Sequence, residues 1–376
     1  MSKRQSLRRF KQKLLQLFDR RDPEACGPTG LARHCLRAVD YAQKFQTPWY
    51  EVYPQLPMPR WKPVRYWGRH RPEFRSKLKT HIPPTGVLVI PGGQVMDIQG
   101  YTFGQEDYFL PDCSYHRDRL EYSHLPKTKY PVTQVAGRCL SLMSNASNNY
   151  YHFLLDCIAR LHLVQKAGIE LKDIDFIHLP KPISDNAWSL LRQLGIEESK
   201  CIWAEPKTGI EAEVLYATTH PGLYLNYPRW VIDFWRTNIR CEVGEPRRRI
   251  YLPRPQGRRK VANEVELFPI LQRYGFEILN MEEIDNQPQL FHDAAVIVTS
   301  HGAALANLVF CQPGTQVLEL MSLEHRLPYF YALSQLAGLE HGCIFGPTIE
   351  PRTSRVGLCF HDFTIHPRAL ERALGD

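Results

Sequence analysis

The second half of the chain alternates short apolar runs with longer amphipathic stretches. The apolar runs, rich in β-branched residues, predict strands at 249–253, 276–279, 296–299 and 316–320. Apolar residues at helical spacing predict helices at 264–274, 288–293 and 328–336. Regular alternation of this kind is typical of a parallel sheet with helices on both faces, so a Rossmann-like α/β domain is expected here.

The first half is less regular. Its apolar runs predict strands at 87–90, 95–103, 132–143, 175–179 and 214–219, and helices within 145–168, at 186–194 and at 230–240. Residues 46–84 are rich in Pro, Trp, Tyr and Arg without a clear period, which predicts an irregular surface segment. This half is still expected to be α/β.

The length of 376 residues exceeds what one ordinary core holds, so two domains are expected. Gly244-Glu245-Pro246 is typical of a linker, and we expect it to connect the two domains. We therefore predict an N-terminal domain at 23–243 and a C-terminal domain at 247–348. The tail at 349–376 is expected to pack back on the N-terminal domain.

Residues 1–22 predict a basic amphipathic helix. Apolar residues at helical spacing share one face and basic residues fill the other; the apolar ones are Leu7, Phe10, Leu14, Leu17 and Phe18. Such a helix either lies on an anionic membrane surface or docks on its own protein, and the sequence leaves both open.

Composition narrows the class of protein. No run approaches the roughly 20 apolar residues of a membrane span, and no apolar stretch of a secretory signal follows the basic N-terminus. The ten cysteines are scattered and form no Cys-x-x-Cys, so reduced thiols in a cytoplasmic protein are expected. The net charge of +8 suits an anionic ligand, and its weak patterning does not favour nucleic acid.

The first candidate site follows the predicted strand at 296–299. The apolar run breaks at His301, Gly302 and Ala303, and a helical stretch then runs to residue 310. A helix N-terminus at a strand end favours an anion, and small residues allow close approach to the backbone. Glu319, expected at the end of the next strand, could accept hydrogen bonds from ribose hydroxyls; the structural alternative is a surface charge.

The second candidate site is a polar loop that leads into a helix. Asn149 begins it, and His152 and Asp156 follow four residues apart, which places them on one helical face. A carboxylate can hold an imidazole in one tautomer and make it a better general base. The structural alternative is a capped helix whose histidine and aspartate bond only to neighbours.

The third candidate site is basic. Arg254 lies just past a predicted strand, and Arg259 lies in the loop that leads to the next helix. Guanidinium groups bind phosphate oxygens bidentately, so this loop suits a phosphate-containing ligand. Asn263 and Glu264 can cap the following helix, which is their structural interpretation.

Other nucleotide and metal motifs are weak or missing. The dinucleotide fingerprint Gly-x-Gly-x-x-Gly and the P-loop are both missing, which weakens a dehydrogenase or ATPase interpretation. Asp173 and Asp175 form an Asp-x-Asp pair that could hold a divalent cation against a diphosphate. They begin a buried-looking strand, so this site carries little weight.

Four blocks of these residues, in order, resemble glycosyltransferase family 61. They are Asn149-Tyr-Tyr-His152-Phe-Leu-Leu-Asp156 with Arg160, Tyr251-Leu-Pro-Arg254 with Arg259 and Asn263-Glu264, Gln289-Leu-Phe291-His-Asp-Ala294, and His301-Gly-Ala-Ala-Leu-Ala-Asn307 with Pro313-Gly314 and Glu319. The resemblance runs from about residue 135 to about residue 345.

The resemblance implies a GT-B fold, in which two Rossmann-like domains face each other across a cleft. It implies an inverting transferase that needs no metal or other cofactor and moves a sugar from a nucleotide sugar, with a UDP-sugar favoured. The acceptor is a hydroxyl of a glycan or lipid-linked glycan, bound on the side of the N-terminal domain. A bacterial-type member that works in capsule or exopolysaccharide synthesis, with peripheral membrane contact through residues 1–22, is the expected setting.

The resemblance also suggests roles for single residues. His152 is the expected base, with Asp156 orienting it or taking the role itself. The expected donor-binding residues are Arg254, Arg259, His301, Gly302, Ala303, Asn307 and Glu319, and Asn149, Asn263 and Glu264 are further candidates. Two alternatives stay open: a non-catalytic nucleotide- or sugar-binding protein on the same scaffold, and a metal-dependent transferase that uses Asp173 and Asp175.

Overall fold

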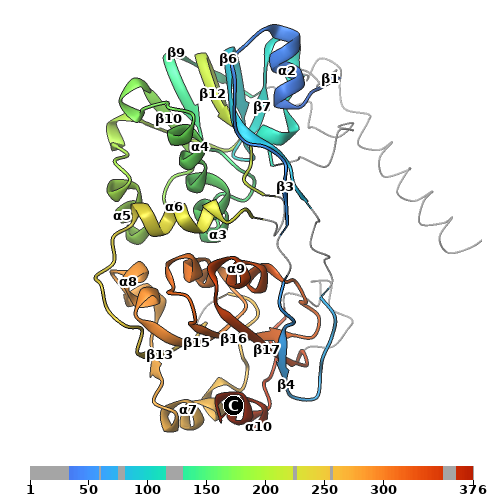
Figure 1. The fold of residues 1–376 in the computed structure, drawn as a ribbon, viewed down its shortest axis with the longest axis vertical. Helices are drawn as coiled ribbons and strands as arrows, with labels where there is room; N and C mark the ends of the chain where they lie inside the picture. The colour runs from blue at the N-terminus through green and yellow to red at the C-terminus, as the bar shows by residue number, and fades with distance from the viewer. Residues whose placement is uncertain are drawn as a thin grey trace, which may run out of the picture.

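The computed structural model describes residues 34–58, 61–74, 81–115, 130–222, 227–254, 257–349 and 361–375. The helix predicted at 1–22 lies outside them. The chain forms two lobes that lie one above the other along the long axis of the molecule, each built on its own sheet (Figure 1). Among the described helices, none is long and apolar enough to cross a membrane.

The first lobe contains a mixed sheet with the order β1-β8-β7-β6-β12-β9-β10-β11 and β2 beside β6. Its strands are β1 (His34–Cys35), β2 (Trp49–Tyr53), β6 (Thr85–Met96), β7 (Tyr101–Phe103), β8 (Tyr108–Phe109), β9 (Val132–Ser141), β10 (Phe176–Leu179), β11 (Cys201–Trp203) and β12 (Gly209–Thr218). β6 runs antiparallel to β2, β7 and β12. The expectation of a Rossmann-like first domain therefore fits only part of this sheet.

That part is formed by β9, β10, β11 and β12, which pair in parallel. A helical segment connects β9 to β10. It consists of α3 (Tyr150–His152), a π-helical turn η4 (Phe153–Cys157), a 3-10 turn η5 (Ile158–Arg160) and α4 (Leu161–Lys166). α5 (Asp185–Gln193) follows β10, and Ser184 caps it by accepting from the Ala187 N–H. Because β12 returns to the other side of β9, the order of strands reverses between these two.

The second lobe contains a parallel sheet with the order β14-β13-β15-β16-β17-β4. The strands are β13 (Arg248–Leu252), β14 (Glu277–Ile278), β15 (Ala294–Ser300), β16 (Gln316–Ser322), β17 (Glu340–Gly346) and β4 (Arg65–Trp67). β4 comes from the segment 46–84, which was expected to be irregular. That expectation is wrong for this stretch, because Tyr66 pairs with Cys343 some 280 residues later and completes the sheet.

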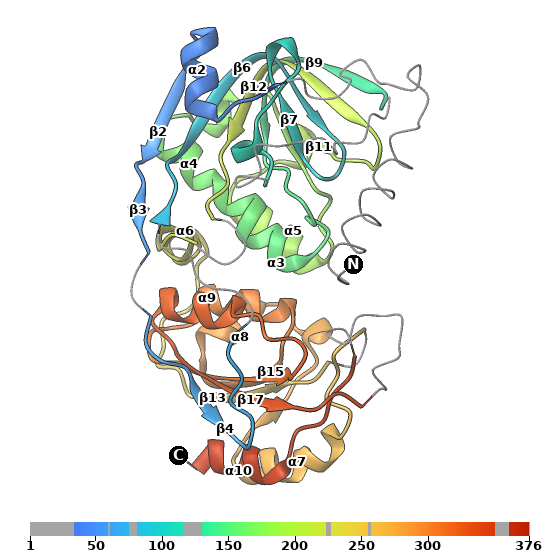
Figure 2. The same cartoon turned by 90° about the vertical axis from the view of Figure 1, so that its right-hand side faces the viewer.

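Helices cover both faces of the second sheet, as predicted. α8 (Gln287–His292), the 3-10 helix η9 (Ala303–Phe310) and α9 (Tyr329–Ala337) lie on the side of the first lobe, whereas α7 (Glu264–Arg273) and α10 (Pro367–Gly375) lie on the far side (Figure 2). The tail thus packs on the second lobe: Leu370 joins its core, and Glu371 pairs with Arg273 of α7. The prediction that the tail packs on the N-terminal domain is wrong.

The remaining elements are short. They are α2 (Ala38–Phe45), the two-stranded pair β3 (Leu56–Pro57) and β5 (His81–Ile82), and the 3-10 turns η2 (Gln105–Asp107), η3 (Pro111–Cys113), η6 (Leu171–Asp173), η7 (Glu198–Lys200) and η8 (Met281–Glu283). The described cysteines are all free thiols.

One buried apolar cluster runs through both lobes. It joins Leu140 and Leu154 of the first lobe to Ile297 and Leu308 of the second. Between them lies α6 (Trp230–Asn238), whose Arg236 donates to the carbonyl groups of residues 309, 311 and 337, at the carboxyl ends of η9 and α9. These carbonyls have no partner within their own helices, so one side chain of α6 ties the lobes together.

Candidate active site

The candidate side chains follow strand ends where the strand order reverses in each lobe. In the second sheet β13 has β14 on one side and β15 on the other, and Arg254 and His301 follow β13 and β15. In the first lobe the helical segment with His152 follows β9, which lies beside β12. Ligands of open α/β sheets bind at such carboxyl ends.

Side chains of both lobes line one cleft of about 180 Å³. The lining residues are Asn149, Tyr151, His152, Arg259, His301, Gly302, Ala303, His325, Leu327, Tyr329 and Phe330. Six of the residues predicted for the site therefore meet here, although more than 140 positions separate His152 from His301. The cleft combines basic groups with an aromatic wall, as a site for a sugar attached to a phosphate requires.

His152 is held by a buried carboxylate. Its Nδ1 lies 2.7 Å from Oδ2 of Asp156, and the other carboxylate oxygen accepts a 2.8 Å hydrogen bond from the Tyr227 hydroxyl. Asp156 is fully buried, whereas the side chain of His152 is 24% exposed. An ionised carboxylate only accepts, so Nδ1 carries the proton and Nε2 of His152 is the nitrogen left for the cleft.

The helix geometry places this pair. Asn149 caps α3 by accepting from the Tyr151 N–H at 2.9 Å, which fixes where the helix begins. Asp156 lies in the π-helical turn η4, a wider turn that is common at functional sites. Asn149, a further site candidate, therefore both caps this helix and lines the cleft.

Arg160 supports the same helix from behind. It is fully buried and donates to the carbonyl oxygen of Met143 at 2.5 Å and to the backbone and hydroxyl oxygens of Thr218 at 3.2 and 3.1 Å. Met143 follows β9 and Thr218 ends β12. Arg160 thus joins the two strand ends to the helix that carries His152.

Arg254 supports the turn at His301. Its Nη1 donates to the His301 carbonyl at 2.8 Å, and a Cβ atom on Gly302 would lie 2.5 Å from the same nitrogen. A Cβ atom at position 302 would therefore displace the guanidinium from its place against the backbone. Burial lowers the pKa of Arg254, and Asp362 opposes that shift.

His301 faces the cleft and is held from behind by Glu319. Its Nδ1 bonds one oxygen of this fully buried carboxylate, and His341 Nε2 bonds the other oxygen at 3.1 Å. The expectation that Glu319 accepts hydrogen bonds from ribose is therefore wrong. Glu319 lies within β16 rather than at its end, and both of its oxygens are engaged.

The pKa values of this pair follow from burial and charge. Burial acts to raise the pKa of Glu319, but the attraction of His301 and His341 in their protonated forms, together with their hydrogen bonds, outweighs it and lowers that pKa to about 2. Burial lowers the pKa of His301; Glu319 opposes this, and Arg259 and Arg254 add to it. Glu319 is therefore an anion that holds a histidine.

Arg259 adopts a left-handed backbone conformation with φ of 65°, which is uncommon for a residue with a side chain. Its Nη1 lies 2.8 Å from Nε2 of His325. Because a guanidinium only donates, His325 Nε2 accepts, which makes this histidine neutral with its proton on Nδ1.

Besides Asp156, Arg254 and Glu319, three more predicted residues lie off the cleft. Asn307 is fully buried, and its amide accepts from the Tyr150 hydroxyl at 2.8 Å and donates to Gln287, so it connects the lobes and has no exposed surface. Asn263 makes no cap bond in α7 but bonds both backbone groups of residue 365. Glu264 accepts from the Tyr251 hydroxyl at 2.6 Å. The expected donor role of Asn307 and the expected capping role of Asn263 are wrong.

The Asp-x-Asp pair lies outside the cleft. Asp175 accepts from the Arg138 N–H at 2.7 Å, at the amino end of β10, and Asp173 ends a short exposed turn. The backbone hydrogen bond from Arg138, with that residue's charge, lowers the pKa of Asp175. This carboxylate is thus engaged at the end of the strand opposite to the one where ligands bind.

A larger cavity, of about 570 Å³, lies in the second lobe by α10. Its walls include Arg69, His70, His366, Arg368 and Arg372. Apart from Asn263, it contains none of the predicted site residues. We take the smaller cleft as the candidate site because His152 of the first lobe meets Arg259, His301 and His325 of the second lobe there.

Some residues of the cleft were missed by the sequence analysis. His325 follows β16 by three positions, so a search for polar residues just after predicted strands could have found it. Tyr227 and His341 had no such signal, because only the tertiary structure brings them to Asp156 and Glu319.

Part of the chain is similar to known proteins. Residues 150–318 match the family model described as Glycosyltransferase 61. Two plant proteins are similar to part of the chain: a beta-1,2-xylosyltransferase of Oryza sativa subsp. japonica, 31% identical over 127 residues, and a beta-1,2-xylosyltransferase of Arabidopsis thaliana, 30% identical over 114 residues.

The matches are partial. They cover 29% and 25% of this chain and 23% and 21% of the two relatives, so the chain matches about a quarter of the length of each relative. Both relatives are plant proteins and give no support to the expected bacterial type or capsule role. The family match contains His152, Arg254 and His301. The comparisons therefore show that residues 150–318 are similar to glycosyltransferase family 61, and they support a glycosyltransferase as the enzyme class.

Proposed function

We propose that the protein is an inverting, metal-independent glycosyltransferase that binds a nucleotide sugar in the cleft between its lobes, with the GT-B organisation. The observation that carries this proposal is the content of the cleft. His152, a carboxylate-held histidine of the first lobe, lines it together with the anion-binding candidates Arg259, His301 and Gly302 of the second lobe. One wall can take up a proton and the other can hold a diphosphate.

In the proposed reaction an acceptor hydroxyl attacks the anomeric carbon from the face opposite the diphosphate. Nε2 of His152 takes the hydroxyl proton, the bond from oxygen to carbon forms, and the bond from carbon to the diphosphate breaks with its electron pair on the leaving oxygen. Asp156 has no exposed surface and both of its oxygens are engaged, which supports the histidine as the base and the carboxylate as its orienting partner.

The leaving diphosphate gains negative charge, which the second lobe is built to stabilise. Arg259 and His301 supply charge and donors, and the backbone at Gly302 and Ala303 begins the helix η9. Arg254 holds that turn and adds its own charge. Preorganised donors of this kind stabilise the transition state without a metal ion.

The relatives suggest a donor. Both are beta-1,2-xylosyltransferases by name, which favours a pentose, in the form of UDP-xylose, as the first donor to test. We propose a glycan hydroxyl as the acceptor and polysaccharide synthesis as the setting. A lipid-linked acceptor, a cytoplasmic location and membrane contact through residues 1–22 remain predictions.

Transfer from UDP-xylose to an array of glycan acceptors, with a chelator present throughout, tests the proposal. We expect the wild type to form product and His152→Gln, which keeps a polar side chain of similar size, to bind the donor without turnover. Donor binding without product for any acceptor in the wild type would favour a non-catalytic binding protein. Activity that the chelator abolishes would instead favour a metal-dependent transferase.

A further inference from the structure

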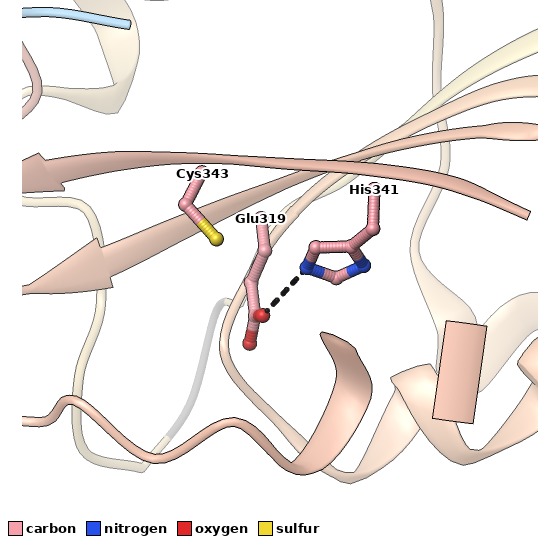
Figure 3. A group of neighbouring side chains, drawn as sticks. All are labelled: Glu319, His341 and Cys343. Carbon is pink, nitrogen blue, oxygen red and sulfur yellow. Dashed lines mark hydrogen bonds and ion pairs between the residues drawn. The ribbon is translucent and has the colours of Figure 1, made fainter. Parts of the chain in front are cut away.

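A chain of hydrogen bonds runs away from the cleft behind His301. His301 Nδ1 bonds Glu319, His341 Nε2 lies 3.1 Å from the other oxygen of Glu319, and Ser334 Oγ lies 2.8 Å from His341 Nδ1. Figure 3 shows Glu319 turned toward His341, with Cys343 on its other side. Each member is buried, and the three inner ones are 0–4% exposed.

The chemistry of each group fixes the direction of these bonds. An ionised carboxylate only accepts, so Nδ1 of His301 and Nε2 of His341 both donate to Glu319. In the neutral form of His341, Nδ1 has a lone pair to which the Ser334 hydroxyl donates. Because Glu319 engages Nδ1 of His301, Nε2 of His301 is the nitrogen that is left for the cleft.

Cys343 lies close to Glu319 and His341, and the three could in principle hold a metal ion. Burial and the charge of Glu319 raise the pKa of the Cys343 thiol well above its usual range. His341 also uses both of its nitrogens in hydrogen bonds. We therefore interpret the cluster as a hydrogen-bond chain.

Apart from Glu319, the groups that the described residues place around His301 carry positive charge or none. Arg254 and Arg259 approach from the loop after β13, His325 from the turn after β16 at 4.4 Å between ring centroids, and Tyr329 and Phe330 from α9. Arg254 and Arg259, together with burial, favour the neutral form of His301. A diphosphate in the cleft would reverse that balance, because an adjacent anion favours the imidazolium.

We propose that His341 is a positioning residue for donor binding. By donating to Glu319, it shares that carboxylate with His301. His301 therefore stays neutral in the empty cleft and takes up a proton from solvent when the diphosphate of a nucleotide sugar binds. The proposal rests on the proposed function, because it requires a diphosphate in this cleft. The protonated ring then donates from Nε2 to the diphosphate and from Nδ1 to Glu319.

His341 affects the charge of His301 because the carboxylate of Glu319 accepts hydrogen bonds from both histidines. With His341 present, part of the charge of Glu319 is taken up by a second hydrogen bond. Without that bond, Glu319 attracts the protonated form of His301 more strongly. His301 would then already carry its proton before the nucleotide sugar arrives, and binding would take up fewer protons.

Calorimetric titration of UDP-xylose in two buffers of different ionisation enthalpy tests the proposal. The diphosphate of a nucleotide sugar does not titrate near neutral pH, so the difference between buffers counts protons taken up by the protein. At pH 7.5 we expect the wild type to take up about one proton per donor bound, as linkage requires for a group that is neutral when free and charged when bound.

Two substitutions at one position separate shape from hydrogen bonding. His341→Phe keeps a ring beside Tyr331 but donates nothing to Glu319, so proton uptake should fall. His341→Gln can still donate to Glu319 and should restore most of the uptake. Cys343→Ala is the matched control in the same buried cluster, and its uptake should equal that of the wild type.

The outcomes separate the two proposals. Failure of the wild type to bind any nucleotide sugar overturns the proposed function. Binding with no proton uptake in the wild type, or equal uptake in wild type and His341→Phe, leaves the function standing and overturns the role of His341. If thermal unfolding shows that His341→Phe is not folded, Ser334→Ala takes its place. This variant removes the hydroxyl that bonds His341, and we expect a smaller decrease in proton uptake. Proton uptake equal to that of the wild type would overturn the role of His341.

Discussion

Two of the three histidines of the cleft, His152 and His301, are each held at Nδ1 by a buried carboxylate, but their surroundings differ. His152 is 24% exposed and has aromatic neighbours, with Tyr115 and Tyr151 against its ring. His301 is 6% exposed and faces Arg254 and Arg259. The same pair of residue types thus suits two tasks: an accessible ring can take a proton from a hydroxyl, and a ring among arginines can hold an anion.

The carboxylates differ as well. Asp156 shares its second oxygen with a tyrosine hydroxyl, a neutral donor that does not titrate near neutral pH. Glu319 shares its second oxygen with another histidine. The first arrangement makes His152 a stronger base. In the second, the single negative charge of Glu319 interacts with the rings of both His301 and His341. The following predictions test this difference.

The largest effect is expected for His152→Ala. Loss of a general base typically costs about 10²- to 10⁴-fold in rate, so turnover should fall by that range. Donor affinity should remain near that of the wild type, because the diphosphate is held by the other lobe. Steady-state kinetics with saturating donor measure this, and turnover within a few-fold of the wild type would remove His152 as the base.

Arg254→Ala should lower turnover by about 10²- to 10³-fold, since it removes a preorganised group at the developing charge and releases the turn at His301. Gly302→Ala tests the same contact from the other side, because its Cβ atom would displace the guanidinium. Both variants should weaken donor binding, which His152→Ala should not. Unchanged donor affinity in both would contradict the assignment.

Acid should destabilise the second lobe through Glu319. The pKa of Glu319 is lowered from 4.5 to about 2 in the fold, so its stabilising contribution is present above about pH 4.5 and is lost as the pH falls toward 2. A shift of this size corresponds to stability on the order of 3 kcal/mol. Denaturant unfolding from pH 6 to pH 3 should show a steeper loss in the wild type than in Glu319→Gln. Equal slopes would mean that Glu319 does not carry this charge.

Tyr227→Phe should have a smaller effect. It removes the hydroxyl that donates to Asp156, and a hydrogen bond to a charged group contributes about 1.5–3 kcal/mol. We expect turnover to fall about tenfold or somewhat more. In a His152→Ala background the same change should add almost nothing, because the two act through one pair. Additive effects would show that Tyr227 acts elsewhere.

Asp175→Asn should leave turnover unchanged with a chelator present. Asp175 binds Arg138 at the amino end of β10, away from the cleft. A loss of activity in this variant, restored by divalent cations, would support the metal-dependent alternative. It would also contradict the assignment of catalysis and donor binding to His152 and His301.

Sequence patterns predicted the second lobe well because its strands are buried on both faces and appear as apolar runs. They missed β4, since Tyr66 lies in a segment without a period and its partner strand lies far along the chain. They also missed the antiparallel part of the first sheet. Strand direction depends on long-range pairing that local patterns do not contain.

The predictions of site residues were limited in the same way, because they too relied on local sequence patterns. His152 and Asp156 were predicted because both lie on one turn of a helix, where sequence spacing determines distance. Glu319 was assigned to ribose because its partner His341 lies 22 positions away on the next strand. Asn307 was assigned to the donor although it bonds Tyr150 of the other lobe. Short-range chemistry can be predicted from spacing, whereas contacts between elements require the fold.

The central claim is that the two histidines divide proton transfer and donor binding between them. Titration of UDP-xylose into His152→Ala and His301→Ala side by side, with a chelator present, tests it most directly. We predict wild-type affinity for His152→Ala and affinity at least tenfold weaker for His301→Ala, which loses one charged hydrogen bond to the diphosphate. Equal affinities, or weaker binding only in His152→Ala, would contradict the division.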